Sequence, residues 1–196
     1  MTDARKIIAD MIEESLDVKQ RLQTETGEKI FACATRMLES LRDGGKLLIC
    51  GNGGSAAEAQ HFASELIGKM WVVERPAIPA IALTTDTSTL TSLSNDFGFD
   101  ECFVRQVHGL GSKGDVLIAI TTSGNSPNII RAVDAAKEMG IITIGLLGGS
   151  GGKVLELVDD CVLVPSDSTP RVQECHHLLS HIFASIIEEG LYGEAG

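Results

Sequence analysis

Aromatic residues are scarce in this chain of 196 residues, which has one Trp, one Tyr and six Phe, 4% of the total. Hydrophobic residues nevertheless make up 43% of the sequence, so aliphatic side chains must supply most of the core. Glycine, in contrast, is abundant at 21 residues. This combination favours an α/β fold, in which buried parallel strands are aliphatic and glycines lie in the turns between strands and helices.

Positive charge is also in short supply. Lys and Arg number 16 against 27 Asp and Glu, which gives a formal net charge of −11. Such a surface repels nucleic acids and anionic membranes on average, and we expect neither as a partner. An anionic substrate would have to be held by a local device, such as a loop of backbone amides.

The cysteines show no CxxC spacing, and their number is odd: Cys33, Cys50, Cys102, Cys161 and Cys175. Most have apolar neighbours, which predicts buried free thiols in a reducing compartment. No segment approaches the roughly 20 apolar residues of a membrane-spanning helix. The first 17 residues carry acids where a signal peptide would be apolar. We therefore expect a cytoplasmic protein.

The N-terminal part is predicted to form two amphipathic helices, over residues 3–23 and 28–43, because apolar residues recur there at helical spacing. Asp43, Gly44 and Gly45 should end the second helix. This helical pair, residues 1–44, exceeds what a sheet needs for covering. We expect it to pack against another subunit.

Five short aliphatic runs follow, each typical of a buried strand: residues 47–50, 78–83, 116–120, 141–147 and 161–164. Helical patterns separate them, at about 55–69, 87–110, 126–139 and 169–190, with a short turn near 153–157. Strands that alternate with helices predict βαβ crossovers and a parallel sheet covered on both faces. The chain, residues 1–196, is thus expected to be a single α/β domain with a doubly wound, flavodoxin-like, five-stranded parallel sheet.

In such sheets ligands bind at the carboxyl ends of the strands. The loops to consider are residues 51–55, 84–88, 121–126 and 148–153. The first, Cys50-Gly-Asn-Gly-Gly-Ser55, has glycines that permit positive φ and close approach of a ligand, and Ser55 could cap the next helix. The alternative is that these glycines only form a tight turn between the strand and the helix, without a ligand.

The third loop is Thr121-Thr-Ser-Gly-Asn-Ser126-Pro127. Ser126 is placed as the N-cap of the next helix and Pro127 as its first residue. Amides at a helix N-terminus, together with several hydroxyls, form an anion site that needs no basic side chain. A hydroxyl-rich turn without a ligand remains the alternative.

Histidines and acids recur at helical spacing on two of the predicted helices. His61 and Glu65 are four residues apart, so they share a helical face. On the last helix Gln173, His177 and His181 recur every four residues, and the neighbouring His176 points elsewhere.

Four of these side chains could form an N/O ligand set for zinc or another divalent ion: His61, Glu65, Gln173 and His181. Polar pairs on helix surfaces show the same spacing, so the spacing alone leaves both readings open. A carboxylate and an imidazole near a phosphate loop also suit proton transfer next to a carbonyl.

Five motifs together carry a family resemblance: Cys50-Gly-Asn-Gly-Gly-Ser55, His61-Phe-Ala-Ser-Glu65-Leu, Asn95-Asp-Phe-Gly98, Thr121-Thr-Ser-Gly-Asn-Ser126, and Val172-Gln-Glu174 through His181. In this order and spacing the chain resembles the phosphoheptose isomerase family of sugar isomerase (SIS) domain proteins. The resemblance implies conversion of sedoheptulose 7-phosphate to D-glycero-D-manno-heptose 7-phosphate through an enediol(ate). That reaction begins bacterial heptose synthesis for lipopolysaccharide or other surface glycans.

The resemblance also implies a homotetramer with active sites between subunits and one zinc ion per subunit. It gives zinc-binding positions to His61, Glu65, Gln173 and His181, and the catalytic pair to Glu65 and His181. Glu65 would be the base between C1 and C2, and His181 would serve ring opening and the oxygens. Substrate-contacting positions are matched by Asn52, Gly53, Gly54, Ser55, Glu65, Asn95, Asp96, Thr121, Thr122, Ser123, Ser126 and Gln173.

Two other functions stay open. One is that of a non-enzymatic SIS protein that binds a replication initiator; such a relative lacks the glutamate and the final histidine that stand here as Glu65 and His181. The other is that of a SIS enzyme or sensor for a different phosphosugar, such as an aminosugar or a pentose phosphate.

Overall fold

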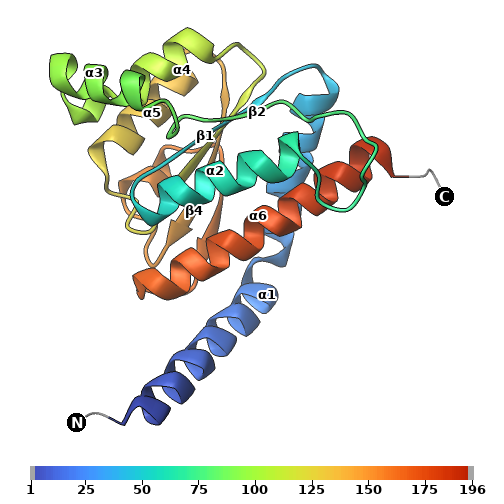
Figure 1. Cartoon of the computed structure of the whole chain (residues 1–196), viewed down its shortest axis with the longest axis vertical. Helices are drawn as coiled ribbons and strands as arrows, with labels where there is room; N and C mark the ends of the chain where they lie inside the picture. The colour runs from blue at the N-terminus through green and yellow to red at the C-terminus, as the bar shows by residue number, and fades with distance from the viewer. Residues whose placement is uncertain (1–2, 194–196) are drawn as a thin grey trace.

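The computed structural model describes residues 3–193. Its centre is a five-stranded sheet in the order β2-β1-β3-β4-β5, and all neighbouring strands are parallel (Figure 1). The strands are β1 (Leu47–Gly51), β2 (Ala80–Ala82), β3 (Val116–Thr121), β4 (Ile142–Gly148) and β5 (Asp160–Val164). The predicted doubly wound parallel sheet is therefore confirmed, and each strand overlaps its predicted aliphatic run.

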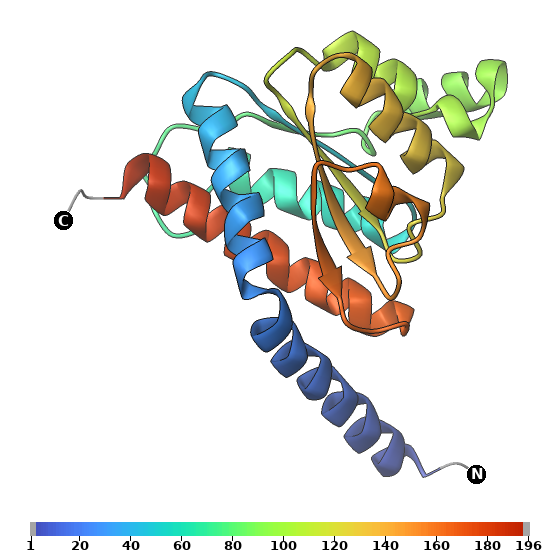
Figure 2. The same ribbon diagram turned by 180° about the vertical axis from the view of Figure 1, so that it is seen from behind.

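Helices cover both faces of the sheet (Figures 1 and 2). On one face lie α1 (Ala4–Arg42), α2 (Gly54–Ile67) and α6 (Thr169–Tyr192); on the other lie α4 (Val104–Leu110) and α5 (Pro127–Glu138). The strand residues alternate accordingly, because successive side chains point to opposite faces. Leu47 and Ile49 of β1 join the core under α1, α2 and α6, whereas Leu48 and Cys50 join the core under α4 and α5.

The prediction of two N-terminal helices is wrong, because α1 is one continuous helix of 39 residues. The segment between the expected helices ends at Gly27, which costs a helix about 1 kcal/mol relative to Ala and does not by itself break it. Thr26 is buried there and donates its hydroxyl to the carbonyl of Leu22 (2.6 Å). As predicted, the helix stops at this turn: Asp43 is the C-cap of α1, and Gly44 follows in the left-handed region (φ 85°).

α1 packs on the rest of the domain from Val18 onward, and its C-terminal part contributes Cys33, Ala34, Met37 and Leu41 to the core. Its N-terminal part projects beyond the body of the domain, and residues 3–14 are exposed (Figure 2). Five large apolar side chains lie exposed along this projecting part: Ile7, Ile8, Met11, Ile12 and Leu16.

The prediction of a single helix over residues 87–110 is also wrong. This segment is divided into α3 (Thr87–Phe97), a short 3₁₀ helix η1 (Phe99–Glu101) and α4. The cause is Gly98, which ends α3 with a φ of 92° that other residues rarely adopt. No residue of α3 is buried.

Two further features match the sequence. All five cysteines are free thiols, and only Cys161 is not fully buried. Among the described residues, no helix is both long and apolar enough to span a bilayer.

Candidate active site

Helices α2 and α6 lie side by side and run parallel on one face of the sheet (Figure 1). The apolar residues of both helices pack into the core between the helices and the sheet. In this core the rings of Phe62 and Phe183 stack with centroids 6.1 Å apart. Because an α-helix repeats every 3.6 residues, the polar residues between these apolar positions fall on the opposite edge. That edge, the seam between the two helices, holds the predicted metal and catalytic side chains.

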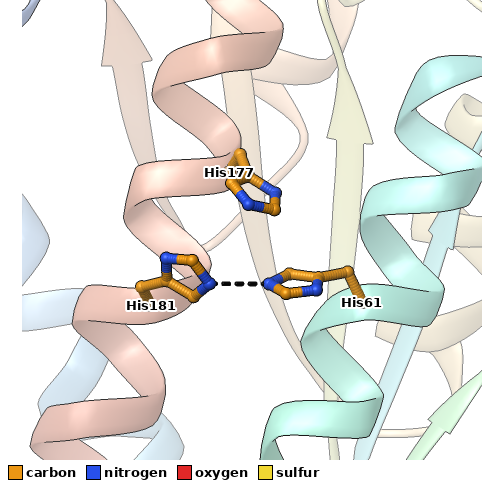
Figure 3. Close-up of side chains that lie close together, drawn as sticks. All are labelled: His61, His177 and His181. Atoms are coloured by element: carbon orange, nitrogen blue, oxygen red, sulfur yellow. Dashed lines mark hydrogen bonds between the residues drawn. The ribbon is translucent and has the colours of Figure 1, made fainter. Parts of the chain in front are cut away.

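Three imidazoles, those of His61, His177 and His181, meet at this seam (Figure 3), and the carboxylate of Glu65 lies beside them. The Nε2 atoms of His61 and His181 are 2.8 Å apart, and Glu65 Oε1 lies 3.8 Å from His61 Nε2. The third imidazole is that of His177, whose ring stacks on His61 with centroids 4.3 Å apart. Burial, followed by the charge that His177 can carry, lowers the pKa of His61. An imidazole whose neutral form is favoured, as that of His61 is, is suited to bind a metal cation.

His177 is oriented from the side of α2. Its Nδ1 lies 2.8 Å from Oε2 of Glu58, whose side chain is 9% exposed, and the other carboxylate oxygen, Oε1, is buried without a hydrogen-bond partner. Neither residue was predicted from the sequence to be a ligand. A signal was available, because Glu58, His61 and Glu65 are spaced as positions i, i+3 and i+7 of one helical face.

His176 points away from the seam, as predicted. It is buried, and its Nε2 lies 3.3 Å from the carbonyl oxygen of Leu147 in β4. Burial lowers its pKa to about 4.

Gln173 lies one helical turn before His177, beside the start of α2. A β-carbon at position 54 would come within 2.5 Å of Gln173 Nε2, so Gly54 leaves the space that this amide occupies. Gln173 is therefore placed next to the loop that follows β1. The expected capping role of Ser55 is wrong, since the N-cap of α2 is Gly53 and Ser55 is buried inside the first turn.

The loops after β1 and β3 meet at the point where the chain turns to opposite faces of the sheet. Asn52, in the first loop, and Asn128, in the first turn of α5, exchange two side-chain hydrogen bonds of 2.9 Å. This is the switch point of the sheet, where doubly wound folds bind ligands.

The Thr121–Ser126 loop has the predicted form. Ser126 is the N-cap of α5 and Pro127 follows in its first turn; the Ser126 hydroxyl makes no capping bond. Thr121 Oγ1 accepts from the amide of Gly124 (3.2 Å), which has a φ of 64°. This loop packs on the segment that follows β4, because the amide of Val154 donates a hydrogen bond to the carbonyl of Gly124 (3.0 Å). The hydroxyls of Thr122 and Ser123 belong to the same loop. The Ser123 hydroxyl accepts a hydrogen bond from the amide of Asn125 (3.3 Å).

Asn95 and Asp96 are not brought to this site within one chain. They lie near the end of α3, where Asn95 Nδ2 donates to Asp96 Oδ1 (2.7 Å). Both are exposed, and α3 packs mainly on η1 rather than on the loops.

The end of α2 next to Glu65 is held by a buried ion pair between Arg75 and Glu188. Arg75 Nη2 donates to the carbonyl of Glu65 (2.8 Å), and its Nη1 donates to the carbonyl of Leu66 (2.8 Å). Glu188 in turn accepts from three successive backbone amides, those of residues 70–72. This pair was not predicted from the sequence, because its partners are 113 residues apart.

Comparison with known proteins gives the family. The SIS domain family model matches residues 10–148. A phosphoheptose isomerase of Trichlorobacter lovleyi is 46% identical over 189 residues, which cover 96% of each chain. The chain belongs to the phosphoheptose isomerase family.

Two solved phosphoheptose isomerases extend the likeness to the fold. That of Francisella tularensis superposes with a TM-score of 0.92 at 41% identity and covers 96% of this chain and 100% of its own. That of Neisseria gonorrhoeae superposes with a TM-score of 0.89 at 44% identity and covers 94% of this chain and 98% of its own. The family resemblance read from the five sequence motifs is confirmed.

Proposed function

We propose that the protein is an aldose–ketose isomerase that converts sedoheptulose 7-phosphate to D-glycero-D-manno-heptose 7-phosphate, the first step of heptose synthesis for bacterial surface glycans. The observation that carries this proposal is the meeting of Glu65, His61 and His181 at the seam between α2 and α6. Membership of the phosphoheptose isomerase family supports the choice of substrate.

Isomerisation moves one proton from C1 to C2 and rearranges the protons on the two oxygens. Glu65 is the base that removes the C1 proton, which leaves an enediol(ate), and it returns a proton to C2. His181 opens the sugar ring and exchanges the proton between the neighbouring oxygens. Side chains with partial exposure can reach a bound sugar, and Glu65 is 22% exposed. A carboxylate base and an imidazole acid are the usual agents of this chemistry.

The phosphate is assigned to the Thr121–Ser126 loop at the N-terminus of α5. The free hydroxyl of Ser126 and the helix dipole favour an anion there. Asn52, Gly53, Gly54 and Ser55 would contact the sugar from the neighbouring loop, and Gln173 lies beside them.

We assign a divalent metal, zinc, to the seam. Its residues fit the ion, because imidazole nitrogens and a carboxylate oxygen are ligands that zinc accepts in a four-coordinate site. The family resemblance gives the set His61, Glu65, Gln173 and His181. When bound, the ion would supply Lewis-acid stabilisation of negative charge on the substrate oxygens.

We also propose that the protein works as a cytoplasmic homotetramer with active sites between subunits. Two surfaces support this assembly: the exposed apolar side chains of the projecting part of α1, and α3, of which no residue is buried. Contact with a second chain would bring residues such as Asn95 and Asp96 to a site from which they are remote in their own chain.

The deciding experiment is incubation of the purified protein with sedoheptulose 7-phosphate and detection of the aldose product. Rapid formation of the heptose phosphate is expected. If an aminosugar or pentose phosphate were converted faster, the protein would be a SIS enzyme of a different specificity. Binding to a replication initiator without any turnover would favour the non-enzymatic alternative.

A further inference from the structure

The glycine-rich loop after β4, Gly148-Gly-Ser-Gly-Gly-Lys153, has no role in the function proposed above. We call it the glycine loop. It leads into a short 3₁₀ helix, η2 (Lys153–Glu156). Because β3 and β4 are neighbours in the sheet, the glycine loop lies beside the Thr121–Ser126 loop, to which the phosphate is assigned and which we call the phosphate loop.

The two loops touch backbone to backbone. A β-carbon on Gly148 would lie 2.8 Å from the carbonyl oxygen of Thr122, and a β-carbon on Gly152 would overlap the carbonyl oxygen of Ser123. Gly152 also has a φ of 54°, which favours glycine. Any larger side chain at either position would push the loops apart, so these glycines permit the contact.

The carbonyl groups of the phosphate loop are turned toward the glycine loop. The Gly124 carbonyl accepts a hydrogen bond from the amide of Val154 (3.0 Å), at the start of η2. With the carbonyls of Thr122 and Ser123, three successive carbonyl oxygens therefore face the same side. A carbonyl oxygen carries partial negative charge and would repel a phosphate. Turning these oxygens away leaves the hydroxyls of the loop and the N-terminus of α5 to the anion.

The side chain of Asn125 joins the two loops. Its Nδ2 donates to the carbonyl of Ser123 (2.8 Å), and its Oδ1 accepts from the amide of Lys153 (3.3 Å). Asn125 is exposed, so it is not needed to fill the core. Its carboxamide instead holds the Ser123 carbonyl and ties the phosphate loop to the start of η2.

We propose that Asn125 is a positioning residue for the substrate phosphate, and that it holds the phosphate loop on the glycine loop with the carbonyls turned away from the anion. Asn125 acts through the loop and does not itself contact the phosphate. A loop already held in its bound form binds its ligand without the cost of ordering. Loosening it should therefore weaken phosphate binding and leave the chemistry at Glu65 intact. This inference rests on the proposed function in taking the phosphate loop as the phosphate site.

The first experiment titrates the full-length protein with inorganic phosphate and follows the backbone amide signals of residues 121–126 by NMR. These signals should shift in the wild type, and Asn125→Ala should bind phosphate about tenfold more weakly. Asn125→Asp keeps the size of the side chain but loses the donor to Ser123 and adds a negative charge, so it should weaken binding at least as much. Ser112→Ala, in the exposed turn before β3, is the control and should bind phosphate as the wild type does.

The kinetics of Asn125→Ala distinguish positioning from a general structural role. With sedoheptulose 7-phosphate, KM should rise about tenfold while kcat stays within about twofold, because the lost interaction serves binding alone. The temperature of unfolding should stay that of the wild type, since the side chain is exposed. A structural role would lower kcat and the unfolding temperature together.

The glycine loop offers a matched pair of variants, Gly152→Ala and Gly151→Ala. Both glycines have a positive φ, 54° and 76°, so alanine strains the backbone at each. The new β-carbon would overlap the Ser123 carbonyl oxygen at position 152 but would meet the side chain of Leu155 at position 151. Gly152→Ala should therefore weaken phosphate binding more than Gly151→Ala does. If Gly152→Ala does not fold, the Asn125 variants still decide.

Phosphate affinity and KM that are unchanged in Asn125→Ala would overturn the inference, as would a wild-type titration in which the amides of residues 121–126 do not shift. The outcome is separate from that of the proposed function. Wild type that binds phosphate on this loop, more tightly than Asn125→Ala does, but does not convert sedoheptulose 7-phosphate refutes only the isomerase assignment. Conversion of the sugar with a normal KM in Asn125→Ala refutes only the role of Asn125.

Discussion

Asn52 and Asn128 join the two halves of the doubly wound sheet through a reciprocal pair of side-chain hydrogen bonds. After β1 the chain turns to one face to form α2, and after β3 it turns to the other face to form α5. The two amides bridge the crevice between these turns. Asn128 is 1% exposed, so its polar atoms depend on partners inside the protein. The pair thereby links the loop after β1 to the loop after β3.

The first prediction is that Asn128→Ala loosens this crevice. The half-buried side chain of Asn52 loses both bonds, and two hydrogen bonds together contribute about 1–3 kcal/mol. We expect a loss of that size in the free energy of unfolding, measured with urea, and a rise in KM for the phosphosugar. Unchanged stability together with unchanged KM would show that the pair does not shape the site.

The second prediction concerns the base. Glu65→Gln keeps the volume of the side chain but removes its charge, and loss of a general base lowers turnover by about 10²–10⁴-fold. Thermal unfolding should stay normal, because the side chain is partly exposed at the seam. The matched control is Glu138→Gln at the exposed end of α5, which should leave turnover unchanged. Near-full activity of the Glu65 variant would remove this residue from the mechanism.

Much of the fold could be predicted from the sequence, because buried parallel strands are continuous aliphatic runs bounded by turn residues. The N-terminal helix could not be predicted in full. Residues 24–27 separate two predicted helices, yet the helix continues, because Leu22 and Cys33 on either side are buried in the core and Thr26 bonds within the helix. The break at Gly98 was missed for the opposite reason, since apolar residues recur at helical spacing on both sides of it.

The candidate site could be predicted only in part. Spacing shows that His61 and Glu65 share one helical face and that Gln173, His177 and His181 share another. It does not show how two helices 120 residues apart along the chain are aligned, and this alignment decides which side chains meet. The parallel packing of α2 on α6 pairs His177 with Glu58, a contact that no local pattern contains.

The third prediction places the phosphate. Ser126→Ala removes a hydroxyl that makes no capping bond in the structure, so stability should not change. A hydrogen bond to a charged group contributes about 1.5–3 kcal/mol, and KM for the phosphosugar should rise roughly 10–100-fold. Ser112→Ala, in the exposed turn before β3 at the other end of the strands, is the control. A phosphosugar complex that shows the phosphate on Lys or Arg side chains away from this loop would contradict the assignment.

The fourth prediction tests the assembly. Ile8→Glu combined with Leu16→Glu places two charges among the exposed apolar side chains of α1 and should convert the proposed tetramer to smaller species in sedimentation experiments. Lys6→Glu makes a charge change on the other side of the same helix and should leave the tetramer intact. The double variant should also lose activity, since the active sites would lie between subunits. A tetramer that survives the double change would show that α1 does not hold it together.

The last prediction concerns the ion pair that holds the end of α2. Burial acts to raise the pKa of Glu188, but bonds from Arg75 and from the amides of Met70, Val72 and Trp71 lower it from 4.5 to about 2. Glu188→Gln leaves the Arg75 guanidinium buried without its counter-ion. Breaking a buried pair in this way costs about 3–5 kcal/mol. At neutral pH we expect a loss of that size in the free energy of unfolding, and a lower turnover because Arg75 also bonds the carbonyl of Glu65.

The pH dependence separates the charge of Glu188 from its packing. A carboxyl whose pKa is lower in the folded than in the unfolded protein stabilises the fold fully above its unfolded value, here 4.5. This stabilisation is lost as the pH falls toward the folded value of about 2. Urea unfolding of wild type and Glu188→Gln at a series of pH values should therefore give a difference that is constant above about pH 5 and narrows below it. A difference that stays constant down to pH 3 would show that the glutamine variant loses packing rather than charge.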